Sequence, residues 1–475
     1  MTLINDTINI KRYGLNYRIE GHSGQRIPVD IFFDEEFFPA EACAERLIEI
    51  ASHPNVRGKI VALPDIFCKN KNFIPGGVAI AVKDRLVPMF AGANNDAMAV
   101  YQSGIAAADL NDEVFERLFA GIQQNITVYR GREKLATRDF LVEQMTMPMN
   151  DFVEYWSERL GDLSNFEGGR SHSDEVLTVR ELEDCFSKER SESIPQFIPY
   201  HDFENAGCHS YGVIDGNSHF IEIDRVEEVY EPAIFSHFGL DTEELLITIH
   251  VGAGDLGIAA NKQFVGRDGS SEAFKFDSEA GIRYRNSNIA AERFGYANRF
   301  RVVEGVKRSL EYATGISTRV KLISDAPHDM VEPIEYRGET LQLHRKGAVR
   351  AMPGKAFGEG HPYSVYGKPF LFPSYPGGDS FLMINTEGNE ESFYTCSHGA
   401  GRNYSMEDAR DKFDESELLD FAESKNVKIF SFGKGFLSSQ APSAFKPIDR
   451  VMDTLTRMNL ARPIARVRPA ALIKT

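Results

Sequence analysis

The chain has 475 residues and a formal net charge of −17, because 53 Lys and Arg stand against 70 Asp and Glu. Hydrophobic residues make up 42% and charged residues 26%, which supports a packed core and excludes wholesale disorder. No apolar run reaches the roughly 18 residues of a membrane span, and the first residues lack the layout of a secretory signal. We therefore expect a soluble cytoplasmic protein with no membrane partner, whose acidic surface could bind nucleic acid only in a local basic cleft.

Helical periodicity predicts helices over 36–52, 111–126 and about 286–314, and Asn111 is placed to cap the second. Nearly continuous apolar runs predict strands at 59–64, 76–82, 219–226, 245–251, 318–324, 368–373, 380–385 and 427–432. The polar, glycine-rich stretch 160–200 indicates a surface insertion or lid. Strands and helices do not alternate strictly and no linker divides the chain. The sequence thus favours one α+β domain over 1–475, with mixed sheets flanked by helices.

Glycines at 252, 254 and 257 form a GxGxxG pattern directly after the predicted strand 245–251. This is the spacing of dinucleotide-binding turns, in which a packed helix follows the glycines. Here glycine and polar clusters follow instead, and no second strand ends in an acidic residue about 20 positions on. We interpret the segment as a glycine-rich loop that lets another group approach the backbone closely.

Three histidines stand at the ends of predicted strands: His219, His250 and His328. Neutral imidazole binds several divalent transition metals, so three rings at strand ends could converge on one ion. Each histidine alone is more often a hydrogen-bonded core residue, and their separations match no local metal-binding motif.

His398 lies in the sequence CSHGAGRNYS, followed by small residues at 399–401 and by Arg402. Small neighbours leave the ring open to a bulky group, and backbone N–H groups with Arg402 could hold phosphate oxygens. The histidine is thus a candidate nucleophile at phosphorus, and the alternative is an incidental histidine in a glycine-rich turn.

A basic cluster at 344–350, HRKGAVR, stands out in an otherwise acidic chain. Its Arg345, Lys346 and Arg350 could bind a phosphodiester backbone, or they could form a solvated charged face. The penultimate residue, Lys474, has no role that the sequence around it assigns.

Taken together, these motifs resemble the RtcB-type RNA ligases, which join RNA ends carrying a 3′-phosphate or 2′,3′-cyclic phosphate to a 5′-hydroxyl. The matching stretches occur in family order, and they are PDIFCKNKNFIPGGVAI (64–80), GNSHFIEI (216–223), IHVGAGDLG (249–257), GYANR (295–299), HRKGAVRAMPG (344–354), SHGAGR (397–402) and IARVRPAALIK (464–474). The resemblance runs from about residue 60 to the end of the chain. Residues 1–60 and 160–200 match only loosely.

The resemblance implies a GTP- and manganese-dependent reaction in which His398 becomes guanylylated. It places the metal ligands at His219, His250 and His328. The implied nucleotide contacts are Ser218, Glu222, Asp329, Ser380, Gly399, Ala400, Gly401 and Lys474. The implied RNA contacts are Arg345, Lys346, Arg350 and Arg402.

One family feature is missing. The family carries an Asp-x-x-Cys whose side chains hold paired metals, whereas this chain reads FAGANNDAMAVY over 90–101. Without a gap the two positions are Asn95 and Met98; with a one-residue shift they are Asp96 and Ala99. Both Asn95 and Asp96 therefore stay candidate metal ligands, and neither register supplies a thiolate. Losing a bridging thiolate should weaken a two-metal site or reduce it to one metal, unless Cys68 substitutes.

The sequence thus predicts an RNA ligase of RtcB-like fold that acts on broken or spliced RNA ends, tRNA among them. An archease-like activator is a possible partner. Two alternatives stay open: a guanylyltransferase acting on other 3′-phosphate nucleic-acid ends, and an RNA-end-binding protein that has lost catalysis.

Overall fold

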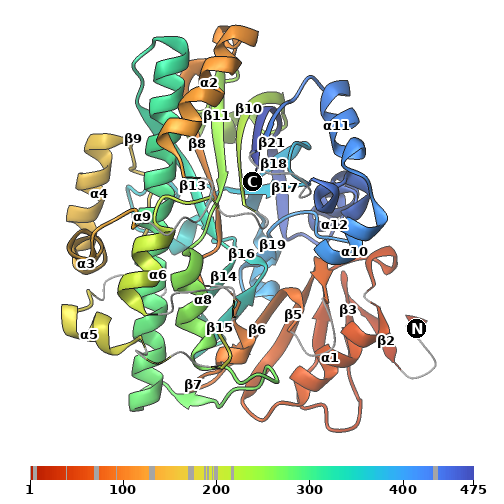
Figure 1. The fold of residues 1–475 in the computed structure, drawn as a ribbon. Helices are drawn as coiled ribbons and strands as arrows, with labels where there is room; N and C mark the ends of the chain where they lie inside the picture. Colours follow the sequence, from red (N-terminus) through yellow and green to blue (C-terminus); the bar gives the residue numbers. More distant parts are fainter. Residues whose placement is uncertain are drawn as a thin grey trace.

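The computed structural model describes residues 2–3, 8–38, 40–68, 74–92, 94–127, 134–168, 176–186, 189, 192–194, 196, 202–214, 219–431 and 437–474. Two large sheets and the helices around them make up this part of the chain (Figure 1). Among the described helices, none combines the length and apolar character that crossing a bilayer requires.

The first sheet is built mainly from the N-terminal part of the chain. Its strands, in spatial order, are β1 (Thr2–Leu3), β2 (Asn9–Tyr13), β3 (Asn16–Ile19), β4 (Val29–Ile31), β5 (Val56–Phe67), β6 (Gly76–Val82), β15 (Glu339–Lys346) and β14 (Asp329–Tyr336). Neighbouring strands are antiparallel except β4 and β5. Helices α1 (Glu41–Ser52) and α12 (Ile448–Arg457) pack on β5 and help bury an apolar core of their own.

The second sheet carries most of the predicted strands. Its spatial order is β17 (Phe370–Pro373), β18 (Ser380–Asn385), β21 (Ala461–Lys474), β10 (Phe220–Val229), β11 (Glu244–His250), β8 (Ala97–Ala106), β13 (Val320–Pro327) and β9 (Gly161–Asp162), with β20 (Lys428–Ser431) pairing beside β21. Two small pairs complete the strands, β7 (Arg85–Leu86) with β12 (Phe274–Lys275) and β16 (Ala348–Arg350) with β19 (Thr395–Ser397).

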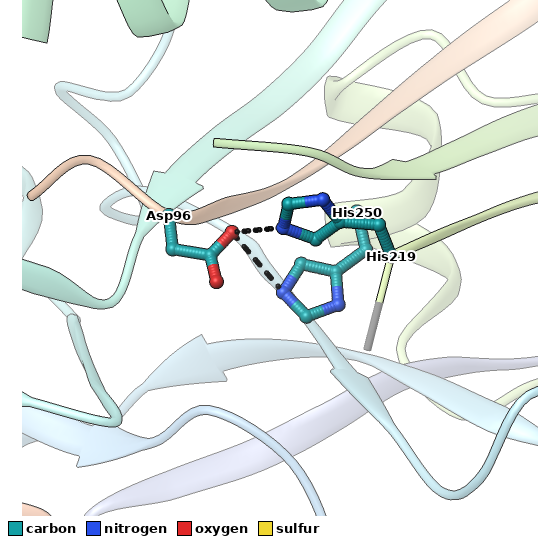
Figure 2. Close-up of side chains that lie close together, drawn as sticks. All are labelled: Asp96, His219 and His250. Atoms are coloured by element: carbon teal, nitrogen blue, oxygen red, sulfur yellow. Dashed lines mark hydrogen bonds and ion pairs between the residues drawn. The ribbon is translucent and has the colours of Figure 1, made fainter. Parts of the chain in front are cut away.

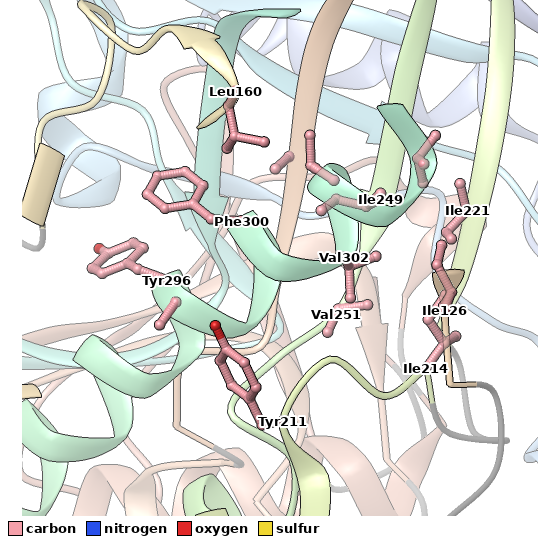
Figure 3. Packing of buried hydrophobic residues seen from close by; sticks show 14 of the residues in the cluster. Ile126, Leu160, Tyr211, Ile214, Ile221, Ile249, Val251, Tyr296, Phe300 and Val302 are labelled. Atoms are coloured by element: carbon pink, nitrogen blue, oxygen red, sulfur yellow. The ribbon is translucent and has the colours of Figure 1, made fainter. Parts of the chain in front are cut away.

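The longest helix, α9 (Glu279–Thr314), covers one face of the second sheet. The Ser278 hydroxyl caps its N-terminus by accepting from the Gly281 N–H, and Gly315 ends it in the left-handed conformation. Figure 3 shows its Tyr296, Phe300 and Val302 beside strand residues such as Ile249. This packing fixes the sheet on which the functional residues lie.

The remaining helices surround this core. They are α2 (Asp112–Asn125), α3 (Arg138–Thr146), α4 (Met149–Arg159), α5 (Val179–Asp184), α6 (Phe203–Ser210), α7 (Pro232–His237), α8 (Gly254–Lys262), α10 (Met406–Lys412) and α11 (Glu415–Ser424). As predicted, the Asn111 side chain caps α2 by accepting from the Val114 N–H. The α+β prediction is confirmed, and each predicted strand segment overlaps an observed strand.

Two local predictions can be compared with the structure. In the stretch 160–200, predicted as a surface insertion or lid, β9 pairs with β13, and Leu163, Leu177 and Leu182 are buried in the main core. A helix, α8, begins at the second of the GxGxxG glycines and contains the third, where we predicted a loop. The pattern is still no dinucleotide-binding turn, because β11 pairs antiparallel with both of its neighbours and forms no parallel βαβ unit.

Candidate active site

The order of strands in the second sheet brings distant residues to one edge. Strands β21, β10, β11, β8 and β13 are neighbours and run antiparallel, so ends and beginnings alternate along that edge. Lys474 ends β21, His219 precedes β10, His250 ends β11, Asp96 precedes β8 and His328 follows β13. Residues spread over almost 400 positions of sequence thereby become neighbours.

Asp96 lies at the centre of this group. Its Oδ1 is 3.1 Å from His219 Nε2 and 3.5 Å from His250 Nε2 (Figure 2). Its Oδ2 is 3.7 Å from His328 Nε2. All three imidazoles are buried. One carboxylate and three imidazoles are a donor set that suits a divalent transition metal.

The charges of the group agree with that use. Burial raises the pKa of the Asp96 carboxyl, but the nearby His219 and His250 outweigh burial and bring the pKa well below its usual range. Burial lowers the pKa of His250, and it lowers that of His328 to about 4. At neutral pH the group therefore offers an ionised carboxylate and, at His250 and His328, neutral imidazoles, the forms that bind metal.

Three glycines hold the 94–96 segment in place. A Cβ on Gly252 would lie 2.9 Å from the Asp96 Cα, and one on Gly257 would lie 2.6 Å from the Asn94 carbonyl oxygen. A Cβ on Gly295 of α9 would lie 2.3 Å from the Asn95 Oδ1. The predicted close approach to the glycine loop is thus made by the protein's own chain.

Asn95 does not join the metal-ligand candidates. Its φ of 61° is left-handed, which turns its side chain toward Gly295 and places Asp96 at the histidines. Its carbonyl oxygen accepts from Arg299 Nη1 at 3.2 Å, so this backbone is fixed from behind. The shifted register, with Asp96 as the acid, is the one that the structure brings to the site.

The thiolate position is apolar. Met98 pairs with His250 across β8 and β11 and lines the cavity, whereas Ala99 packs on the opposite face of the sheet. Cys68 does not line the cavity and is not among the metal-ligand candidates, although a hydrogen bond with Cys43 of α1 lowers the pKa of its thiol. No cysteine joins the metal-ligand candidates among the described residues.

His398 stands opposite this edge and is held by Asp65 of β5. The Asp65 Oδ2 accepts from His398 Nδ1 at 2.7 Å and from the His398 backbone N–H at 3.1 Å, while Oδ1 accepts from the Ser397 hydroxyl at 2.7 Å. The His398 side chain is 31% exposed, and its ring centroid is 4.9 Å from that of His328. Burial lowers the His398 pKa, but Asp65 outweighs burial and raises it above its usual value.

The small residues after His398 allow close packing. A Cβ on Gly399 would lie 2.9 Å from the Pro373 carbonyl oxygen, and one on Gly401, whose φ is 78°, would lie 2.7 Å from the Asp65 Cα. The Ala400 N–H already donates to the Pro373 carbonyl at 2.8 Å, so it is not available to a phosphate in this arrangement.

A cavity of about 400 Å³ joins the two halves of the site. Its polar lining comes from both halves of the site and consists of Asp65, Asp96, His250, His328, Asp329, Lys346, His398 and Arg402. Residues 399–401 also line it, and an apolar wall includes Phe220, Pro373 and Phe445. Asp329 Oδ1 accepts from the Gly347 N–H at 2.7 Å, and burial raises its pKa to about 7. Lys346 donates to the Ile74 carbonyl oxygen at 2.8 Å.

Three predicted nucleotide contacts lie behind the cavity wall. Glu222 accepts from the Gly377 N–H at 2.6 Å, Ser380 is buried at the start of β18, and the Lys474 ammonium donates to the His219 carbonyl oxygen at 2.7 Å. Ser218 lies outside the described residues.

Two predicted RNA contacts are not placed at the cavity. Arg345 is fully buried and its guanidinium pairs with Glu332, and Arg350 pairs with Glu332 and with Glu167. Lys368 also reaches Glu167, at 2.7 Å. Buried basic side chains are retained where acids neutralise them, so these arginines belong to an interior ion-pair network. Lys346 and Arg402 are the members of the predicted basic set that line the cavity.

Asp65 is the functional candidate that the sequence reasoning missed. The only local signal was a carboxylate directly after the predicted apolar strand 59–64, where a buried acid needs a partner. Lys446 supports the same segment by donating to the carbonyl oxygens of Pro64 and Ile66 at 2.6 and 3.0 Å.

Comparison with known proteins agrees with this arrangement. A tRNA-splicing ligase RtcB of Methanococcus maripaludis is 23% identical over 483 residues, covering 94% of this chain and 95% of the relative. An RNA-splicing ligase RtcB of Mycobacterium tuberculosis is 26% identical over 285 residues, covering 56% of this chain and 65% of the relative. A tRNA-splicing ligase RtcB of Methanocaldococcus jannaschii is 27% identical over 284 residues, and the match covers 55% of this chain but 29% of that relative.

The match to the tRNA-splicing ligase RtcB family model extends over residues 46–475 and takes in the metal-ligand candidates, Asp65 and His398. It leaves out the first strands of the first sheet, β1 to β4. Because the match spans nearly the whole chain, the protein belongs to the tRNA-splicing ligase RtcB family.

Proposed function

We propose that this chain is an RNA ligase that joins a 3′-phosphate or 2′,3′-cyclic phosphate end to a 5′-hydroxyl end, with GTP and Mn²⁺ as cofactors and His398 as the guanylylated nucleophile. The observation that carries the proposal is one cavity in which an aspartate-bound histidine faces a carboxylate surrounded by three imidazoles. The family membership supports the same reaction class.

The Asp65–His398 pair supports the nucleophile assignment. Because Asp65 accepts the Nδ1 proton, the lone pair of the neutral ring is on Nε2. When Nε2 attacks phosphorus, the ring gains positive charge, and the adjacent carboxylate stabilises that charge. Asp65 is a positioning residue here, and His398 forms the bond.

The proposed reaction has three balanced steps. The His398 Nε2 bonds to the α-phosphorus of GTP, and the bond to pyrophosphate breaks. An oxygen of the RNA 3′-phosphate then takes the guanylate, and the N–P bond breaks. Finally the 5′-hydroxyl oxygen bonds to the RNA phosphorus, its proton leaves to a base, and GMP departs; a cyclic phosphate must first be hydrolysed.

Other residues of the cavity bind and neutralise charge in this proposal. Asp96, His219, His250 and His328 would hold the metal, which supplies charge neutralisation at the phosphates when bound. Lys346 and Arg402 line the cavity and would face the phosphates of GTP or RNA. A local basic contact of this kind is compatible with an acidic chain, because phosphate binding needs positive charge only in the cleft.

The test is incubation with α-labelled GTP and Mn²⁺, followed by denaturing electrophoresis. We expect an acid-labile, alkali-stable label, as a phosphoramidate requires, that is lost in His398→Ala and kept in His237→Ala, a matched change at an exposed histidine of α7. A label that survives in His398→Ala would refute the nucleophile. No label with any divalent metal would favour the RNA-end-binding alternative.

The acceptor is tested separately. We expect ligation of RNA 3′-phosphate ends and no ligation of the matching DNA ends. A labelled protein that joins DNA but not RNA ends would favour the alternative guanylyltransferase. If an archease-like activator acts on this chain, we expect its addition to increase the rate of adduct formation without changing which ends are joined.

A further inference from the structure

The two carboxylate oxygens of Asp96 face different imidazoles. Oδ1 is close to the Nε2 atoms of His219 and His250, at 3.1 and 3.5 Å. Oδ2 is 3.7 Å from His328 Nε2. Figure 2 shows the first two contacts converging on one oxygen while the other oxygen points away from them.

The two separations from Oδ1 match one coordination position, and the 3.7 Å from Oδ2 to His328 is slightly longer than such a position gives. Donor atoms about 2.1 Å from one cation lie about 3.0–3.5 Å apart at octahedral to tetrahedral angles. Asp96 Oδ1, His219 and His250 offer donors that all lie within 4.8 Å of one another, and His328 is not a member of that group. His328 and Oδ2 instead form a second pair on the side of His398.

The described side chains supply no anionic sulfur to this centre. Met98 occupies the sheet position beside His250, and a thioether is neutral. The Cys68 sulfur lies against the Cys43 thiol and does not line the cavity, and Cys185, Cys208 and Cys396 are buried elsewhere in the core. The anionic ligand that both coordination positions share is the Asp96 carboxylate.

We propose that Asp96 bridges two divalent cations, one shared with His219 and His250 and one shared with His328, so that a carboxylate takes the place of the bridging thiolate. The inference deepens the proposed function, since it concerns the metals of the same site. A centre of nitrogen and oxygen donors alone should favour Mn²⁺ more, and thiophilic Zn²⁺ and Cd²⁺ less, than a thiolate-bridged centre does. The second position has two protein donors and leaves room for phosphate oxygens.

Electron paramagnetic resonance and metal stoichiometry test the proposal without any turnover. The full-length protein is titrated with Mn²⁺, alone and with a GTP analogue whose α,β-bridging oxygen is a methylene. We expect two Mn²⁺ per chain and a spin-coupled spectrum in at least the second condition. His328→Gln should bind one Mn²⁺ with an uncoupled six-line spectrum, and Asp96→Asn should lose the coupling and weaken both positions.

Asp65→Asn is the matched control, because it also removes one buried carboxylate charge beside the cavity but touches no metal-ligand candidate. It should keep both Mn²⁺ while slowing adduct formation. A wild-type protein that binds at most one Mn²⁺ in both conditions, or an Asp96→Asn protein that keeps the coupled pair, would overturn the inference. Loss of adduct formation with the coupled pair intact would instead refute the proposed function.

Cobalt substitution gives a second readout that does not depend on folding of a variant. A thiolate ligand produces a near-ultraviolet sulfur-to-cobalt charge-transfer band in the Co²⁺ protein, and we expect no such band here. A strong band that disappears when Cys68 is changed to Ser would show that a thiol reaches the metal and would overturn the proposal.

Discussion

Changing Asp65 to Asn should slow the guanylylation of His398 without moving the ring. An asparagine can place its carbonyl oxygen where Oδ2 accepts from His398 Nδ1 and from the backbone N–H, and its amide can donate to the Ser397 hydroxyl oxygen. All three hydrogen bonds are then kept, and the difference is the negative charge.

The charge sets the magnitude. A hydrogen bond to an ionised group contributes about 1.5–3 kcal/mol and a neutral bond about 0.5–1.5 kcal/mol, and the 2.7 Å bond to Nδ1 strengthens as the ring becomes positive. The neutral bond that replaces the charged one is weaker by about 1–1.5 kcal/mol, which corresponds to a rate about 5–10-fold lower. Asp65→Ala should fall further, because it also leaves buried donors without an acceptor.

The assay is single-turnover label transfer from α-labelled GTP at saturating Mn²⁺, with Ser397→Ala as the control. That change removes one partner of Asp65 but leaves both bonds to His398, so it should reduce the rate only a few-fold. The reasoning would be refuted if Asp65→Asn reacted at the wild-type rate, or if Ser397→Ala slowed the reaction as much as Asp65→Asn.

Three further changes test separate parts of the structure. Gly401→Ala should lower both the melting temperature and the rate of label transfer. A left-handed residue with a side chain costs about 1–2 kcal/mol, and the new Cβ would lie 2.7 Å from the β5 backbone. Gly358→Ala is the control and should change neither quantity, because nothing lies within 4 Å of a Cβ at that position. Arg345→Met should lower the free energy of unfolding in urea by about 3–5 kcal/mol, because it leaves buried Glu332 without this partner, and it should not change the salt dependence of RNA binding. Lys346→Met should reduce the slope of the logarithm of the RNA-binding constant against the logarithm of the salt concentration by about one. Burial raises the pKa of Asp224 to about 7. Between pH 4 and pH 7 the folded state therefore keeps a proton on Asp224 that the unfolded state has released. The free energy of unfolding consequently falls as the pH rises from about 4 to about 7. Asp224→Asn should remove this loss, and its advantage over wild type in unfolding experiments should grow from pH 4 to pH 7, by up to about 4 kcal/mol.

The main strands could be predicted because burial on both faces leaves long apolar runs. Strand 76–82 coincides with β6, for example, and 380–385 with β18. The short strands β2 to β4 were not predicted, since three to five residues are too few to show a clear period. Helix α8 was not predicted, because glycine has a weak helix propensity. The helix forms because Leu256, Ala259 and Ala260 pack against the core, and this packing outweighs the propensity of its glycines.

The site was predictable where a residue type carries its own chemistry. Histidines at strand ends could be recognised as candidates, and the sheet order brings His219, His250 and His328 beside Asp96. Asp65 could not be found in this way, because its partner His398 lies 333 residues away and no local pattern connects them. Arg345 was misassigned for the same reason, since its partner Glu332 lies on a neighbouring strand and a charge run does not reveal it.

The ambiguity between Asn95 and Asp96 has a different cause. Both residues were reasonable ligands in sequence, and the choice depends on one backbone angle, the φ of 61° at Asn95. That angle is stable because the absence of a side chain at Gly295 leaves space for the Asn95 amide, and because Gly252 lets the Asp96 backbone approach the end of β11.

The nucleophile and the metal-ligand group therefore depend on different carboxylates. Asp65 comes from the first sheet and acts on His398, whereas Asp96 comes from the edge of the second sheet and acts on the three imidazoles. His328 follows β13 of the second sheet and precedes β14 of the first, and its ring lies against that of His398. A change in the relative position of the two sheets would therefore alter the distance between the nucleophile and the metal-ligand group.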